Sequence, residues 1–450
     1  MNKTKKLLIV GLICCSACTV LANNKKNSIN DSYISKSDST IISKLNWRLF
    51  FYSPHLNKLI DTLLINNADI QTAYRQLDIA NSYYNMSRGA QWPSMQTSIT
   101  HTPTSGWYKT NPPIGFGLNL SSSWEIDLWG KLSNLKKAAR MRFLAPEEGI
   151  RMVKTTLISE LAKSYYELVF YDEELRVTDK NINLQTNAFE IVKVQKAAGK
   201  ATNLAVLQFE AQLLDSKTKK FEIERQIIHY ENRINLLLHR GYQNIIRDKG
   251  FDLATNRKVS LKEIPSSEIT NRPDIAEARL QLQAAGFDVK AAHKAFYPSL
   301  VIQPNLGVLA DNPSQLLNPL ALSWGVFSSL TTPIFQNYLL KGRLKIKEAE
   351  RKQAMINYQQ RLYKGFAEVS ENISKIESTE SEISILRNQV AVLDSAVSTS
   401  RDLYVYGYAS YLEVINTQKS VQDAELKLIS IEKEQCHLWI DLFRSLGGGE

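Results

Sequence analysis

The sequence predicts a mainly α-helical protein with a small β part, built as a tandem duplication of one structural unit. Three observations support this prediction: a long internal repeat, two long stretches without proline, and two shorter stretches in which polar and apolar residues alternate. Of the 450 residues, 44% are apolar and 22% are charged, which is typical of a folded chain rather than a disordered one. The same composition leaves open several ordinary domains or one extended one.

The internal repeat relates the two halves of the chain. Residues 67–73 reappear in pattern at 272–278, which is an offset of 205 positions, and residues 199–204 match 407–412 at an offset of 208. The residues that define the repeat best are Asp69 and Pro93 in the first half and Arg272, Pro273, Asp274 and Pro298 in the second. Agreement at this many spaced positions indicates duplication of one unit.

The distribution of proline predicts where the long helices lie. All 13 prolines fall outside residues 147–264 and 334–450. Because proline costs about 3 kcal/mol inside a helix, its absence favours helix in both stretches. Gly199 and Gly407 interrupt the two stretches near their middles, and glycine readily takes the left-handed conformation that turns a chain. Each stretch is therefore predicted to be a hairpin of two helices with arms of about 50 residues, roughly 75 Å long.

A shorter helix and a pair of strands are predicted ahead of each hairpin. The helices are expected at about 54–90 and 271–296, the second with proline in its first turn. The strand pairs are expected within 94–128 and 299–335, which are rich in Ser, Thr, Gly and Pro and contain alternating segments. The first repeat then covers residues 54–264, with its tip near 199, and the second covers 265–450, with its tip near 407.

The N-terminus has the pattern of a secretory signal peptide. Three lysines precede a short apolar run and then small residues, which predicts removal of residues 1–17. Cys18 is the candidate for lipidation because small residues precede it, as in bacterial lipoproteins, and residues 18–53 would form a lipid-anchored extended segment. Cleavage after Ala22 is the alternative. With Cys18 acylated, only Cys436 keeps a free thiol in the mature chain, so no disulfide is expected.

Several classes of function lack support in the sequence. The net charge of +10 comes without nucleic-acid motifs, so we expect no nucleic acid partner. No catalytic motif or metal-ligand spacing is present, and we therefore predict no enzyme activity and no cofactor. No run of about 18 apolar residues occurs after the leader, which excludes a membrane-spanning helix in the mature chain.

Four strands in one chain raise a question of closure. An open sheet edge in lipid leaves backbone N–H and C=O groups unpaired, and four strands cannot close a barrel. If these segments enter the outer membrane, several chains must contribute strands, and three copies would give twelve. A periplasmic protein with two coiled-coil hairpins and small strand-rich parts is the alternative that the pattern alone leaves open.

A resemblance to a known family favours the first interpretation. The chain resembles the TolC- and OprM-like outer membrane factors over nearly its whole mature length. The segments that support the resemblance are residues 46–48, 56–60, 124–130, 271–275, 296–298, 333–335, 403–407 and 446–449. None is specific alone, but their order and spacing together are.

The resemblance implies a homotrimer, with a twelve-stranded β-barrel in the outer membrane and a trimeric α-barrel in the periplasm. It implies a passive exit duct for drugs or other small molecules, with a periplasmic adaptor, an inner membrane efflux transporter and outer membrane lipid as partners. The expected location is the outer membrane, with a lipid anchor and a large periplasmic part. A duct for type I protein secretion and a periplasmic coiled-coil adaptor are the alternative functions.

The resemblance also implies where a periplasmic gate would lie. Constriction residues of the family follow the second tip glycine by five to nine positions, which here are Leu412, Glu413 and Asn416. An apolar ring and an acidic ring are expected from the first two, with helix packing and an ordinary exposed acid as alternatives. Asn416 departs from the aspartate of the family and puts a second acidic ring in doubt. The expected tip or adaptor contacts are Gly199, Leu204, Tyr404 and Gly407.

Overall fold

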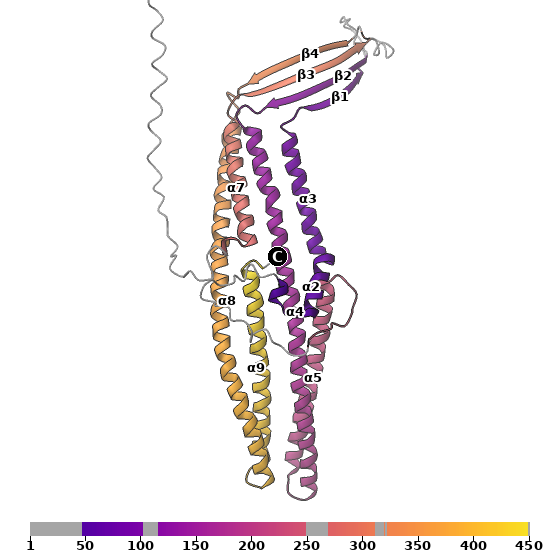
Figure 1. Ribbon diagram of the computed structural model, residues 1–450, viewed down its shortest axis with the longest axis vertical. Helices are drawn as coiled ribbons and strands as arrows, with labels where there is room; N and C mark the ends of the chain where they lie inside the picture. Colours follow the sequence, from indigo (N-terminus) through magenta and orange to yellow (C-terminus); the bar gives the residue numbers. More distant parts are fainter. Residues whose placement is uncertain (1–46, 102–115, 249–268, 311–318, 320–321, 449–450) are drawn as a thin grey trace, which may run out of the picture.

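The computed structural model describes residues 47–101, 116–248, 269–310, 319 and 322–448. The predicted leader and Cys18 lie outside the described residues. The molecule is a long column of helices with a sheet across one end and two hairpin tips at the other (Figure 1). None of the described helices is both long and apolar enough to cross a membrane.

The order of elements confirms the predicted tandem, mainly helical fold. The first half contains α1 (Trp47–Phe50), α2 (Pro54–Asn66), α3 (Ala68–Gly89), β1 (Ser94–His101), β2 (Phe116–Ile126), α4 (Lys131–Ala197) and α5 (Asn203–Leu237). The second half contains α7 (Pro273–Lys294), β3 (Ser299–Ala310), β4 (Leu322–Thr331), α8 (Leu339–Val405) and α9 (Tyr411–Ser445).

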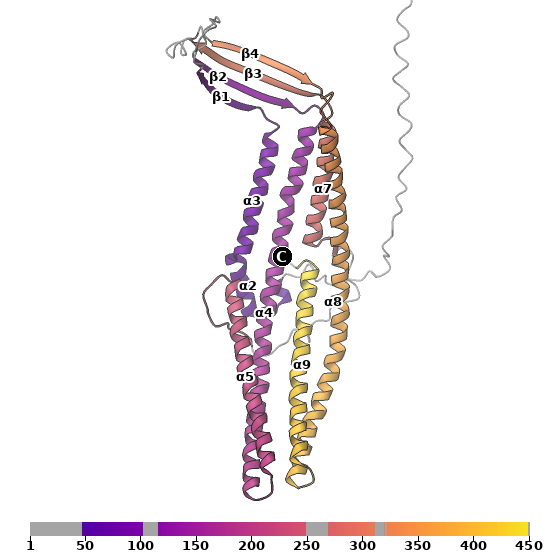
Figure 2. The ribbon, with the colours of Figure 1, turned by 180° about the vertical axis from the view of Figure 1, so that it is seen from behind.

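The hairpin arms are unequal, and the prediction of two arms of about 50 residues was wrong. The long helices α4 and α8 have 67 residues each, roughly 100 Å at about 1.5 Å per residue, whereas α5 and α9 have 35 each. The remaining length of each long helix is covered by a 22-residue helix, α3 beside α4 and α7 beside α8 (Figures 1 and 2).

In the first repeat, a proline hid part of the length of the long helix. Helix α4 begins at Lys131 and contains Pro146, so the proline-free stretch underestimated it. Packing explains why the helix continues: α4 lies between α3 and α7, and Ala145 and Ile150 on either side of the proline are buried. Tertiary contacts outweigh the cost of one proline here.

The predicted single helix over residues 54–90 is two helices that meet at Asn67. The Asn67 side-chain oxygen accepts hydrogen bonds from the N–H groups of Asp69 (2.8 Å) and Ile70 (3.3 Å), which caps α3. Its side-chain amide donates to the carbonyl of Leu237, the last residue of α5, at 2.9 Å. Helix α3 is thereby held end to end with α5.

The second repeat forms the same kind of joint at the equivalent positions. Arg272 precedes α7 and donates from Nη1 to the carbonyl of Ser445, the last residue of α9, at 2.9 Å. Asn67 and Arg272 are 205 positions apart, and Leu237 and Ser445 are 208 apart, as the sequence repeat requires. Each repeat is therefore one long helix paired with a composite of two shorter helices.

The main hydrophobic core lies at mid-length, where these joints are. Phe50 and Phe51 pack around Phe443, with ring centroids 4.5 and 5.7 Å from it. Tyr165 of α4 and Ile60 of α2 are fully buried in the same cluster. The core thus joins the start of the chain to the end of α9.

The sheet has the order β1-β2-β3-β4, with all neighbours antiparallel. Alternate residues of a strand point to opposite faces, and paired residues share a face. Through the pairs Leu118↔Val308 and Leu306↔Trp324, one face collects the apolar side chains. This apolar face consists of Met95, Ile99, Phe116, Leu118, Leu120, Trp124, Ile126, Leu300, Ile302, Leu306, Val308, Leu322, Trp324, Val326 and Leu330.

The opposite face is polar and concave. It carries hydroxyl and amide side chains, and a recess of about 320 Å³ is lined by several of them together with Phe327. Its polar members are Ser94, Gln96, Asn119, Ser121, Ser123, Gln303 and Asn305. An antiparallel sheet with one apolar and one polar face has one side suited to an apolar environment and the other suited to water.

Candidate functional site

The functional candidates gather at the end of the column that lies away from the sheet, where both hairpins turn (Figure 1). Gly199 and Gly407 have φ angles of 71° and 79°, the left-handed region that suits glycine. The N–H groups of Lys200 and Tyr408 donate to the carbonyls of Gln195 and Leu403 at 2.8 Å each. These bonds close both helices and set the direction in which α5 and α9 begin.

The start of α9 is organised by a capping box. The Ser410 N–H donates to the Glu413 carboxylate at 2.7 Å, and the Ser410 side chain caps the Glu413 N–H in return. A carboxylate in the first turn also interacts favourably with the helix dipole. Glu413 is therefore exposed but held in one place.

The structure brings the three candidate gate residues together. Leu412, Glu413 and Asn416 are all exposed and lie on one face at the start of α9, whereas Val414 and Val421 are buried on another face. Three- and four-residue spacing places residues on the same side of a helix. Leu204, the equivalent of Leu412 in the first repeat, is also exposed, with 58% of its surface accessible.

The two tips touch each other through residues from both repeats. The hydroxyl of Tyr404 hydrogen bonds to the side-chain oxygen of Gln195. A small apolar cluster formed by Val192, Ala205 and Phe209 packs against Tyr411 and Ile415 of α9. Sequence reasoning selected Tyr404 but missed Gln195, because no pattern marks a contact between residues 209 positions apart.

A polar seam separates this tip cluster from the main core. Thr178, Asn181 and Gln185 of α4 are buried, as is Gln422 of α9. The Gln185 amide donates to the Gln422 oxygen at 3.5 Å, while Gln185 Oε1 and Gln422 Nε2 have no hydrogen-bond partner among the described residues. A buried polar atom left unpaired costs about 1–3 kcal/mol, so the hairpins adhere weakly along this seam.

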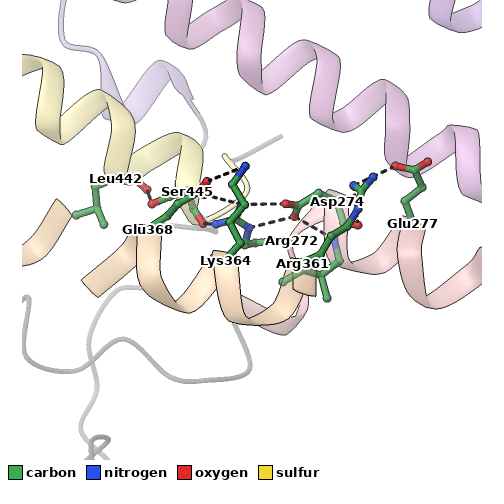
Figure 3. A network of polar contacts seen from close by, with 9 residues as sticks. Arg272, Asp274, Glu277, Arg361, Lys364, Glu368, Leu442 and Ser445 are labelled. Carbon is green, nitrogen blue, oxygen red and sulfur yellow. Dashed lines mark hydrogen bonds and ion pairs between the residues drawn. The ribbon is translucent and has the colours of Figure 1, made fainter. Parts of the chain in front are cut away.

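Two of the residues that define the repeat, Arg272 and Asp274, belong to a polar network at mid-length (Figure 3). Arg272 is buried, and its guanidinium group donates to both oxygens of Asp274 (3.0 and 2.9 Å), to Glu368 (2.9 Å) and to the Ser445 carbonyl. These partners raise the pKa of Arg272 against the opposing effect of burial. Gly447 has a φ of 94°, and a side chain at that position would come within 3.2 Å of Pro273 Cδ.

The equivalent prolines stand at the base of the sheet. Pro93 and Pro298 directly precede β1 and β3, and Asp69 lies in the first turn of α3. The indole N–H of Trp129 donates to the Pro298 carbonyl at 2.8 Å, and its ring stacks on Tyr297 with centroids 5.2 Å apart. The first repeat thus reaches across to the second at this level.

A sheet with an apolar wall, set on long paired helices in two repeats, defines a class of protein: the outer membrane channel subunits. The chain belongs to the outer membrane efflux protein family, whose pattern it matches over residues 59–239 and 264–448. It is an outer membrane efflux channel protein, as predicted from the resemblance. Among the described residues, no group of three or more His, Cys, Asp and Glu side chains could hold a metal ion.

Individual relatives and a solved structure agree with this assignment. The chain is 28% identical to the probable outer membrane lipoprotein SilC of Salmonella typhimurium, covering 94% of this chain and 91% of SilC. It is 27% identical to the cation efflux system protein CusC of Escherichia coli K12, covering 90% and 88%. A crystal structure of CusC superposes with a TM-score of 0.85 at 25% identity, covering 92% of this chain and 99% of that one.

Proposed function

We propose that three copies of this chain form the exit duct of a tripartite efflux pump, together with a periplasmic adaptor and an inner membrane transporter. The observation that carries the proposal is the open sheet with one apolar wall, set on helices roughly 100 Å long. The duct is passive and catalyses no reaction, so its partners supply the energy of transport.

The two edges of the sheet require other copies of the chain. Strands β1 and β4 each pair on one side only within the described residues. Unpaired backbone groups in lipid cost several kcal/mol each, as an order of magnitude. Because β4 and β1 run in opposite directions, β4 of one copy can pair antiparallel with β1 of the next, and three copies make a closed ring of twelve strands.

The exposed face at the start of α9 forms the periplasmic gate. In a trimer, Leu412, Glu413 and Asn416 each occur three times around the axis. The leucines form an apolar constriction, the glutamates a ring that favours cations, and the asparagines a neutral polar ring. The capping box supports this role because it holds Glu413 in one position while leaving it exposed.

The cargo is a small molecule or ion, and Cys18 carries the lipid anchor. Relatives named for cation efflux and for an outer membrane lipoprotein support both statements. Protein secretion is the weaker alternative, because none of these names describes it. Membership of the channel family rules out the periplasmic adaptor considered as an alternative from the sequence.

Conductance of the purified protein in planar bilayers tests the proposal. The wild-type protein should run as a trimer and form a channel of low conductance, and Leu412→Ala with Glu413→Gln should raise the conductance and weaken cation selectivity. Glutamine preserves the capping box, so Glu413→Gln removes charge without removing the cap. A monomer contradicts the trimeric duct, and an unchanged conductance in the double variant contradicts the gate.

A further inference from the structure

The two hairpin tips are equivalent by duplication but differ in chemistry. Residues 190–204 of the first tip correspond to 398–412 of the second at the offset of 208. The backbone is the same in both, with a glycine of positive φ and a helix restarting four residues later. The two tips therefore differ only in the side chains at equivalent positions.

The first tip is basic. It carries Lys193, Lys196 and Lys200, all exposed, against the single acid Glu190, which leaves a net charge of +2. Lys193 Nζ lies 2.9 Å from Glu190 and 4.1 Å from the centre of the Phe189 ring. Lys196 donates to the Asn203 side chain at 2.7 Å. Two of the three ammonium groups are thus held in position on the turn.

The second tip replaces this charge with tyrosine. Tyr404 and Tyr408 stand where the first tip has Lys196 and Lys200, and Tyr406 and Tyr411 are nearby. Arg401 and Asp402 are the only charged residues in this tip and cancel each other. Tyr406 and Tyr408 are 76% and 84% exposed. Aromatic side chains with a polar end are typical of protein interfaces.

One tip is basic and the other is rich in tyrosine, and this difference favours a protein rather than a lipid surface as the partner of the tips. In a threefold ring, basic and tyrosine-rich tips alternate six times. A lipid surface is chemically uniform and offers no reason for alternation, whereas a ring of protein subunits can present two different surfaces in turn.

We infer that the first tip docks on an acidic helical surface of the periplasmic adaptor and the second tip on an uncharged surface of it. This inference rests on the proposed function, which supplies the adaptor. Lysines meet carboxylates, and the tyrosines contribute apolar contact and hydroxyl hydrogen bonds. The gate residue Leu412 is the last residue of the second tip and Glu413 directly follows it, so docking on the uncharged surface contacts the segment that opens.

Site-specific photocrosslinking in intact cells tests the inference. The photoreactive residue benzoylphenylalanine replaces Lys200 in one full-length variant and Tyr408 in another, and mass spectrometry identifies the crosslinked peptides. We expect both variants to capture the same periplasmic protein, with an acidic segment at position 200 and a segment of no net charge at position 408. A neutral or basic segment at position 200, or a crosslink to lipid, overturns the inference.

A charge reversal provides the second measurement. Lys193→Glu with Lys196→Glu should lower the crosslinking yield at position 200 about tenfold, because like charges then face each other. The control is Lys217→Glu with Lys219→Glu on α5, which changes the net charge equally and should leave the yield unchanged. Equal yields in the two variants contradict the acidic surface. If the variants at positions 200 and 408 form no crosslink to any protein when the lysines are left unchanged, adaptor docking itself is contradicted, and with it the proposed function.

Discussion

Asn67 and Arg272 occupy the same position in the two repeats, and each donates a hydrogen bond to the last carbonyl of the helix that ends against it. Asn67 reaches Leu237 and Arg272 reaches Ser445, both at 2.9 Å. The neutral amide makes one such bond, whereas the guanidinium group also binds two carboxylates. Both repeats therefore have the same helix joint, formed by a neutral amide in the first repeat and by a charged guanidinium group in the second.

Replacement of Arg272 should therefore destabilise the protein severely. Arg272→Ala removes a buried guanidinium group that donates to the partly buried Asp274 and Glu368 carboxylates and to the Ser445 carbonyl. Loss of one partner of a buried ion pair costs about 3–5 kcal/mol. Thermal unfolding of the detergent-solubilised trimer measures the change. Arg75→Ala, which breaks an exposed pair with Asp78, should have an effect below about 1 kcal/mol; similar losses in both variants would refute the prediction.

Tyr404→Phe should open the channel more often. It removes the hydroxyl that bonds to Gln195 and joins the two tips, while keeping the ring. The change weakens a tip contact by about 1 kcal/mol, roughly a fivefold shift in an equilibrium between closed and open tips. Single-channel recording checks the open probability. Tyr406→Phe at the same tip is the matched control because Tyr406 is 76% exposed, and an equal effect of the two would exclude a role for the Gln195 contact.

The polar seam predicts an unusual double-mutant cycle. Gln185→Leu alone should destabilise the hairpin contact, since it removes the donor to Gln422 Oε1 and leaves that oxygen buried without a partner. Adding Gln422→Leu should recover that loss and exceed the wild-type stability by about 1 kcal/mol, because two apolar side chains then pack against each other. Hydrogen exchange of α9 amides reports on the contact. If the α9 amides of the double variant exchange as fast as those of the single variant, the buried polar groups of the seam must have other hydrogen-bond partners.

His437 should make stability fall in acid. Burial, Lys163 and Lys433 lower the pKa of His437 from 6.5 to about 4, although the Asp441 carboxylate opposes the shift. Between pH 6.5 and 4 the unfolded chain binds a proton that the folded one does not, so the free energy of unfolding decreases as the pH falls, by at most about 3 kcal/mol. His437→Gln should flatten this part of the unfolding profile. The exposed His229→Gln should not, and a wild-type profile in His437→Gln would contradict the assignment.

Much of the architecture could be predicted because it depends on local chemistry repeated in sequence. Gly199 and Gly407 mark turns that require positive φ, and alternation marks the strands. The start of α4 could not be predicted, because Pro146 argues locally against a helix that packing on both sides maintains. The break at Asn67 was overlooked although Asn67 and Asp69 form an ordinary capping signal.

The contacts of the candidate site could not be predicted, because they join segments that are far apart in the sequence. Leu412, Glu413 and Asn416 were expected only from the family resemblance, which places constriction residues five to nine positions after Gly407; the structure places them on one exposed helix face, and their role as a gate stays a prediction. The partners of the tips are contacts between distant segments. Nothing in the sequence distinguishes buried Gln185 and Gln422 from solvated glutamines on a helix surface, so the weak seam became visible only in the folded chain.

The joints at Leu237 and Ser445 also determine how the molecule bears tension. Along the column, α4 and α8 are covalently continuous for 67 residues, while the composites beside them are held together at mid-length by side-chain hydrogen bonds. A force along the column would pass through these two continuous helices, and the hydrogen-bonded joints of the composites would separate first. The molecule is therefore stiff under stretching along its length but compliant to sliding of one composite half past its neighbour.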